Sequence, residues 1–162
     1  MNVEVPIKVL YIAGSGRCGS TLVARLLGEL DGYCNLAEAS RYLFNLEMQG
    51  RRRPCSCGCD PKDCTFWAHL LSNIPPDIPK FVTAHVRIRN IPWMTRRLAN
   101  SPKGTSLDEA SRSLKSVLGS IADREQGAVI VDSSKNPATG LLLSSLDGIE
   151  LSVVHLVRDP RA

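Results

Sequence analysis

The chain has 162 residues and a formal net charge of +4, and 43% of its residues are hydrophobic against 22% charged. This length is enough for one domain with a hydrophobic core, and the composition excludes a disordered or fibrous protein. The mild positive charge suits an anionic ligand without requiring nucleic acid, and no apolar run is long enough to span a membrane.

The first residues, MNVEVPIKVLYIAG, carry Glu4 and Lys8 close to apolar residues. They lack the basic, apolar and cleavage regions of a signal peptide in that order. A cytoplasmic, reducing location is therefore expected, and there the six cysteines are more often thiols or metal ligands than disulfides.

The stretch VLYIAGSGRCGSTLVARLLGEL predicts a buried strand at 7–13, a tight turn at 14–19 and an amphipathic helix from 21 to about 29. Its spacing is nearly that of a P-loop, but Ser20 stands where a nucleotide triphosphatase has its lysine. Backbone N–H groups of such a turn attract an anion, and the planar charge of Arg17 suits phosphate or sulfonate oxygens. The missing lysine argues against an ATPase or GTPase, and Asp132 does not continue into a Walker-B pattern.

A second helix is expected from near Glu38 to before Gly50, then a loop at 50–64 and a short helix at about 62–72. The loop holds four cysteines spaced C-x-C-x-C-x4-C, which could bind zinc tetrahedrally although the usual C-x2-C spacing is absent. Loop thiols, a disulfide and a metal site remain equally open. The cysteines are Cys55, Cys57, Cys59 and Cys64.

Residues 84–99 are expected to be partly helical, with Arg96 and Arg97 exposed. A long helix is predicted from Ser106 to about Gln126, where Gly127 ends it. AVIVDSSK then predicts a strand and a turn, residues 138–146 a helix, and LSVVHLV a strand of the kind buried on both faces of a parallel sheet.

Strands separated by helices predict a single α/β domain over residues 1–162, with a parallel sheet flanked by helices. The chain stops at RDPRA, directly after a predicted core strand. Because the sites of such sheets lie at the carboxyl ends of strands, we expect an amino-terminal portion of a longer protein, with the fold incomplete at its carboxyl end.

Three motifs together resemble one family. GSGRCGSTLVARLL resembles the 5′-phosphosulfate loop of sulfotransferases that use 3′-phosphoadenosine 5′-phosphosulfate (PAPS), and VVHLVRDPRA is similar to their 3′-phosphate motif. VDSSKNP is similar to the segment that supplies a lysine in bacterial and tyrosylprotein-type members, and CSCGC…CTFW resembles a Cys-rich insertion of bacterial relatives. The order of these motifs, from residue 12 to 162, is more specific than the glycine loop alone.

The resemblance implies a three-layer P-loop-type fold, truncated after the 3′-phosphate motif. It implies transfer of a sulfuryl group from PAPS to a hydroxyl, or less often an amine, on a small-molecule, carbohydrate or lipid acceptor. No metal is needed for this chemistry, and no nucleic acid partner is expected.

The resemblance also implies site residues. Arg17 would contact the phosphosulfate, Glu38 would take the proton of the acceptor, and Lys135 would donate to the bridging oxygen as the 5′-phosphate leaves. Arg158 would meet the 3′-phosphate, with Asp159 orienting it. The residues expected to bind the donor are Ser15, Gly16, Arg17, Cys18, Gly19, Ser20, Thr21, Ser134 and Arg158.

Several alternatives stay open at this point. Glu38 is equally explained as an acid in a first helical turn. The alternative role of Thr21 is a helix cap, which is compatible with ligand binding, and the alternative for Lys135 is a solvated turn residue. His85 is the rival base, whereas His69 and His155 are expected to be packed. A small-molecule kinase with an altered P-loop and an inactive nucleotide-binding fragment are the alternative functions.

Overall fold

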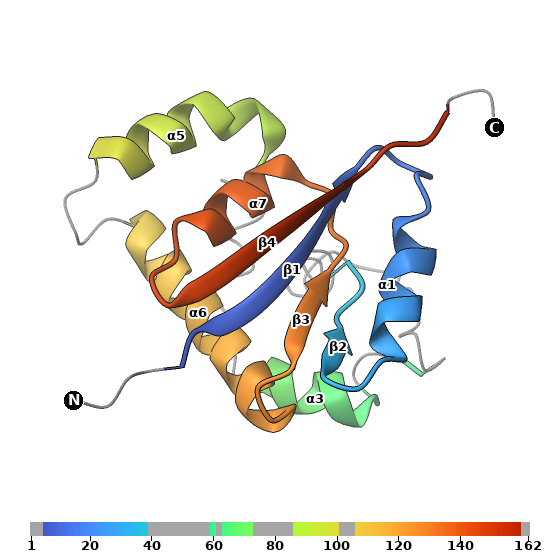
Figure 1. The fold of residues 1–162 in the computed structure, drawn as a ribbon. Coiled ribbons are helices and arrows are strands. Elements are labelled where there is room, and N and C mark those ends of the chain that lie inside the picture. Colours follow the sequence, from blue (N-terminus) through green and yellow to red (C-terminus); the bar gives the residue numbers. More distant parts are fainter. Residues whose placement is uncertain (1–4, 39–58, 61–62, 73–85, 101–105, 160–162) are drawn as a thin grey trace.

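The computed structural model describes residues 5–38, 59–60, 63–72, 86–100 and 106–159 (Figure 1). In this part of the chain, four parallel strands form one sheet in the order β2-β3-β1-β4. The α/β class and the parallel sheet flanked by helices are therefore confirmed. The strands are β1 (Ile7–Gly14), β2 (Tyr33–Asn35), β3 (Val129–Asp132) and β4 (Ile149–Leu156).

The helices lie where apolar residues recur at helical spacing. The predicted helix at 62–72 is found from Thr65 onwards, and the long helix ends at Arg124, shortly before Gly127 with its φ of 80°. The segment at 84–99 contains a 3-10 turn and a helix, and Arg96 and Arg97 are exposed as expected. The helices are α1 (Ser20–Gly28), α3 (Thr65–Ser72), η1 (Ile88–Asn90), α5 (Ile91–Asn100), α6 (Ser106–Arg124) and α7 (Pro137–Ser144).

The sheet separates two hydrophobic clusters of unequal size. Along β1, Val9 and Tyr11 point into the larger cluster, which includes Ile121 of α6 and residues of α7. Ile12 points into the smaller cluster with Ala24 of α1. Because successive side chains of a strand point to opposite faces, this alternation places α1 on one face of the sheet and α6 and α7 on the other (Figure 1).

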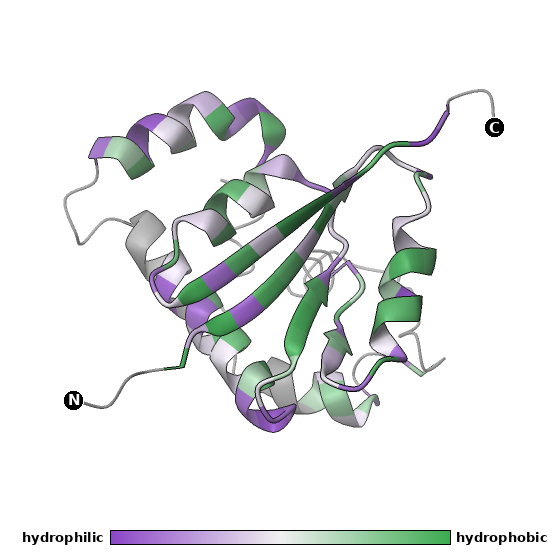
Figure 2. Ribbon diagram, in the orientation of Figure 1, coloured by the Kyte–Doolittle hydropathy of each residue, from purple (hydrophilic) through white to green (hydrophobic). Residues whose placement is uncertain are grey.

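The expectation that LSVVHLV is buried on both faces is wrong. In the described sheet β4 is an edge strand, and Val153 and Val154 are 58% and 38% exposed. His155, expected to be packed, is also exposed. Figure 2 shows the hydrophobic residues that β4 and α1 carry. An apolar run indicates a strand, but it does not indicate which elements cover that strand.

The expected helix after Glu38 and most of the Cys-rich loop, residues 39–58, lie outside the described residues. Within the described part, no helix combines the length and the apolar character needed to cross a membrane.

Candidate functional site

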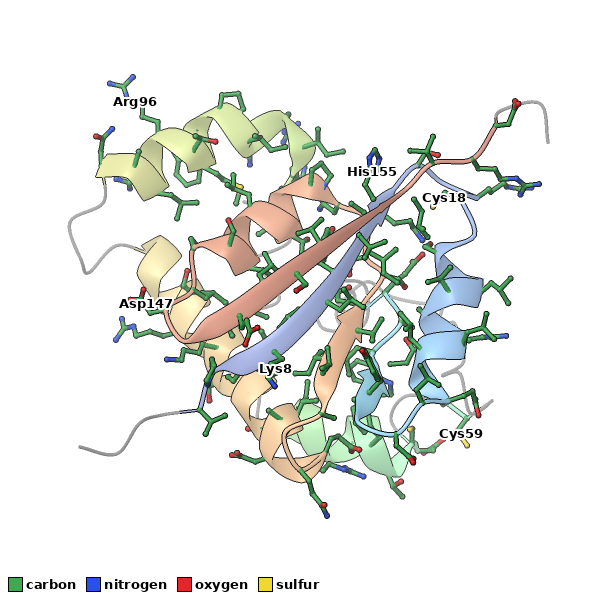
Figure 3. The ribbon with its side chains drawn as sticks, in the orientation of Figure 1. Lys8, Cys18, Cys59, Arg96, Asp147 and His155 are labelled. Carbon is green, nitrogen blue, oxygen red and sulfur yellow. The ribbon has the colours of Figure 1, made fainter. Side chains whose placement is uncertain are left out.

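The glycine turn joins β1 to α1 at the carboxyl edge of the sheet. Gly14 has a φ of 152°, and a Cβ atom there would lie 2.7 Å from the carbonyl oxygen of Leu156 and 2.8 Å from Cys18 Sγ. Glycine is therefore required for β1 to run beside the end of β4 and then turn. Figure 3 places Cys18 in this turn, next to the end of β4.

The start of α1 is organised by backbone groups. Gly19, with a φ of 94°, is the N-cap residue, and its carbonyl accepts the N–H groups of Leu22 at 3.0 Å and Val23 at 3.1 Å. The first N–H groups of a helix have no intrahelical acceptor, so they are suited to an anion at this turn. The alternative that Thr21 caps the helix is wrong, because the helix begins one residue before it.

Lys135 connects three parts of the chain at this turn. Its Nζ lies 3.0 Å from Ser20 Oγ at the start of α1 and 2.8 Å from Glu38 Oε1, just beyond β2. Ser20 is at the position where the P-loop pattern has lysine. An ammonium group therefore reaches the glycine turn from the tip of β3 instead of from the turn itself.

The ion pair between Lys135 and Glu38 is partly buried, with side chains 18% and 23% exposed. Opposite charges that are partly buried in a protein attract each other more strongly than charges in bulk water, because the protein has a lower dielectric constant than water. A cation and a carboxylate are thus held side by side at an anion-attracting turn. A carboxylate can take a proton as a general base, and an ammonium group can stabilise negative charge that develops nearby.

Three residues of the site have left-handed backbone: Arg17 with a φ of 63°, Ala37 with 54° and Lys135 with 60°. Among the described residues the fourth non-glycine residue with positive φ is Gln126, at the end of α6. Such conformations are unfavourable for residues with a Cβ, and they gather where structure is held for function. The sequence carries no signal for this feature, since arginine, alanine and lysine do not favour it.

A hydrogen-bond network fixes the turn that carries Lys135. The backbone N–H of Ser134 donates to Asp132 Oδ1 at 2.8 Å, and the Ser134 hydroxyl donates to the same oxygen. Tyr11 Oη donates to the carbonyl of Asn136 at 2.7 Å. Burial raises the pKa of Tyr11 and the charge of Asp132 raises it further, so the phenol remains a donor.

Asn136 has two further contacts. Its Oδ1 accepts the N–H of Ala138 at 3.0 Å and so caps α7, and its Nδ2 donates to the carbonyl of Val86 at 3.2 Å. Tyr11, Asp132 and Asn136 were not predicted from the sequence as supports of the site. The Asn-Pro pair at 136–137 is the signal that could have indicated a helix start, since asparagine favours the cap and proline the first helical position.

Arg158 follows β4 and lies against the glycine turn. Its Nη1 donates to the carbonyl oxygen of Arg17 at 3.4 Å, and both side chains are exposed. Because Leu156 pairs with Gly14, the ends of β1 and β4 are adjacent. Arg158 therefore lies beside the turn that contains Arg17.

Several of the remaining candidates lie outside the described part of the chain. His85, Cys55 and Cys57 lie outside that part, as does the side chain of His69. Cys59 is exposed and Cys64 is buried. The described residues contain no group of three or more potential metal ligands.

Cys34 lies on β2, an edge strand of the described sheet. Burial raises the pKa of its thiol to about 11, the charge of Glu125 raises it as well, and Arg124 opposes them. The thiolate is the reactive form of cysteine, and it is scarce at such a pKa.

The chain matches no protein-family model, no curated protein and no solved structure.

Proposed function

We propose that this chain is a P-loop-type sulfotransferase domain that uses PAPS as the sulfuryl donor. The observation that supports this best is the position of Lys135, whose ammonium lies 3.0 Å from Ser20 Oγ at the glycine turn and 2.8 Å from Glu38. Three groups that the reaction would use lie close together. They are a turn suited to an anion, a cation for the leaving phosphate and a carboxylate for the acceptor proton.

In the proposed reaction, an acceptor hydroxyl oxygen forms a bond to sulfur while the bond from sulfur to the 5′-phosphate oxygen breaks. The proton of the hydroxyl passes to Glu38, and the charge that develops on the phosphate oxygen is stabilised by Lys135. The contact between Lys135 and Glu38 opens before this step, when the donor binds and Lys135 turns to the phosphate. Arg17 and the first N–H groups of α1 hold the phosphosulfate oxygens.

Arg158 supports a second anion pocket for the 3′-phosphate. Its guanidinium lies at the end of β4, against the carbonyl of Arg17. A donor with phosphate groups at both its 3′ and 5′ positions would be held between two neighbouring strand ends. This pocket would distinguish PAPS from other adenine nucleotides.

The structure offers less support for a kinase that binds magnesium and ATP. The loop has no lysine, and the Asp132 carboxylate accepts two hydrogen bonds from Ser134, from its backbone N–H and its hydroxyl. A Walker-B aspartate would need that carboxylate for the metal. We therefore expect nucleotide binding that does not depend on magnesium.

Calorimetry tests the binding part of the proposal. We expect adenosine 3′,5′-bisphosphate to bind more tightly than ADP, with the same affinity in magnesium and in a chelator. Arg158→Gln should remove most of this preference, roughly 10- to 100-fold, because a charge-assisted hydrogen bond to phosphate is lost. Arg25→Gln, an exposed arginine on α1, is the matched control and should change nothing. Tighter, magnesium-dependent binding of ADP would contradict the proposal.

The transfer step can be tested without knowing the acceptor. With adenosine 3′,5′-bisphosphate and p-nitrophenyl sulfate, the reverse reaction forms PAPS and releases coloured p-nitrophenolate. Lys135→Met should slow this exchange by roughly 10²–10³-fold, because one donor to the reacting phosphate oxygen is lost. Glu38→Gln should slow it far less, since nitrophenolate leaves without a proton. Tight binding of the bisphosphate with no exchange would indicate a nucleotide-binding fragment without catalysis.

A further inference from the structure

An exposed basic and aromatic surface lies on η1 and α5, away from the glycine turn. We call it the basic–aromatic face. In α5, Met94 is fully buried, whereas Trp93 is 41% exposed and its neighbours one turn later are arginines. Ile88 of η1 is 64% exposed. The residues of the face are Arg87, Ile88, Arg89, Trp93, Arg96 and Arg97, and all are exposed.

In the sequence, the segment that contains this face carries charge of one sign over a long stretch. Between the acidic residues Asp77 and Asp108, six of the 20 lysines and arginines occur and no aspartate or glutamate. Two of these six, Lys80 and Lys103, lie outside the described residues. The chain thus concentrates positive charge on a segment whose described arginines are exposed, and such a surface favours an anionic partner.

One side of α5 packs in the core, and the other side is exposed. Met94 packs in the core, and Ile91 and Leu98 pack partly against it. On the other side Arg97 Cζ lies 5.7 Å from the centre of the Trp93 ring, a cation–π contact. Figure 3 shows Arg96 pointing away from the body of the molecule. The exposed side of α5 therefore carries both an apolar ring and cationic groups.

We propose that the basic–aromatic face binds the surface of a membrane that contains anionic lipids. The arginines would contact lipid phosphates and carboxylates, while Ile88 and Trp93 would enter the boundary between headgroups and acyl chains. Tryptophan favours this boundary, and arginine can keep its charge in the headgroups while its stem covers apolar surface.

Two observations favour a lipid surface over a nucleic acid, an acidic peptide or an anionic glycan. Ile88 is exposed between two arginines, and an aliphatic side chain contributes nothing to a purely polar polyanion. The Trp93 ring carries the guanidinium of Arg97 instead of standing apart as a platform for a base or a sugar. A bilayer interface uses both the charge and the exposed apolar groups.

This inference goes beyond the proposed function and does not depend on it. The face is nevertheless connected to the candidate site, because Asn136, next to Lys135, donates to the carbonyl of Val86 at the start of the segment.

Vesicle co-sedimentation tests the charge requirement. We expect binding to vesicles of phosphatidylcholine mixed with phosphatidylserine, weakening as sodium chloride rises, and no binding to phosphatidylcholine alone. The double variant Arg96→Gln/Arg97→Gln should bind roughly 30-fold more weakly. The double variant Lys8→Gln/Arg25→Gln removes the same charge from exposed positions elsewhere and should bind like the wild type. Equal weakening in both double variants would overturn the proposal.

Fluorescence tests the insertion. The chain has two tryptophans, and Trp67 is only 4% exposed. We expect brominated phosphatidylcholine in anionic vesicles to quench Trp93, and Trp93→Phe to abolish this quenching while Trp67 emission persists. Binding of the protein to these vesicles without quenching of Trp93 would contradict the proposal that this face enters the lipid boundary. Binding of a homopolymeric RNA, with no binding to any vesicle, would show that the partner is a polyanion and would also overturn the proposal.

Discussion

At the glycine turn, the ammonium group of Lys135 meets the hydroxyl of Ser20, the residue at the position where a P-loop pattern has lysine. Ser20 is buried, and its hydroxyl is 3.0 Å from the ammonium group. From the tip of β3, Lys135 also pairs with Glu38 at 2.8 Å. The ion pair avoids an unpaired, partly buried charge at the site.

The geometry of the turn at Gly14 yields a stability prediction. Gly14→Ala should lower the free energy of unfolding by about 2–4 kcal/mol, because the φ is unfavourable and the new Cβ meets the Leu156 carbonyl and Cys18 Sγ. Denaturant unfolding measures this loss. Gly16→Ala is the matched control in the same turn, since a Cβ there has no atom within 4 Å, and it should change stability by less than about 0.5 kcal/mol. Equal losses in both variants would show that the close approach at Gly14 does not matter.

At the scale of elements, the sequence allowed correct prediction of features that depend on neighbours in the chain. The apolar run before Gly14 indicated β1, and the helical spacing after Gly19 indicated α1. The long helix α6 and its end near Gly127 were also predicted. Each of these signals is contained in a short window, because periodicity and turn residues act locally.

Features that depend on the assembled sheet were not predicted. The apolar sequence of β4 indicated a buried strand, but burial depends on what packs against it, and Val153 is 58% exposed. The meeting of Lys135 with Ser20 and Glu38 joins residues 115 and 97 positions apart. It requires the order β2-β3-β1, which no local pattern encodes. The family resemblance indicated these residues, but not their contacts.

At the scale of the whole molecule, the two faces of the sheet differ in how much apolar surface packs against them. The larger cluster includes fully buried residues of α5, α6 and α7, whereas on the other face the fully buried residue of α1 packed in the smaller cluster is Ala24. Leu22 and Leu26 of α1 are 64% and 61% exposed. Because less apolar surface holds α1, we expect α1 and the glycine turn to open more easily than the body of α6.

Hydrogen exchange tests this difference and its link to ligand binding. Without ligand, the amides of α1 should exchange faster than those around Ile121, which is fully buried in α6. Adenosine 3′,5′-bisphosphate at about 100 times its dissociation constant should slow exchange in α1 by up to about 100-fold, because each opening must first release the ligand. Amides of α5, whose local opening leaves the glycine turn intact, should keep their rates. If α1 exchanged as slowly as Ile121 without ligand, the unequal packing would have no energetic consequence. If the exchange rates of α1 stayed the same with ligand, this would show that the nucleotide does not bind at this turn.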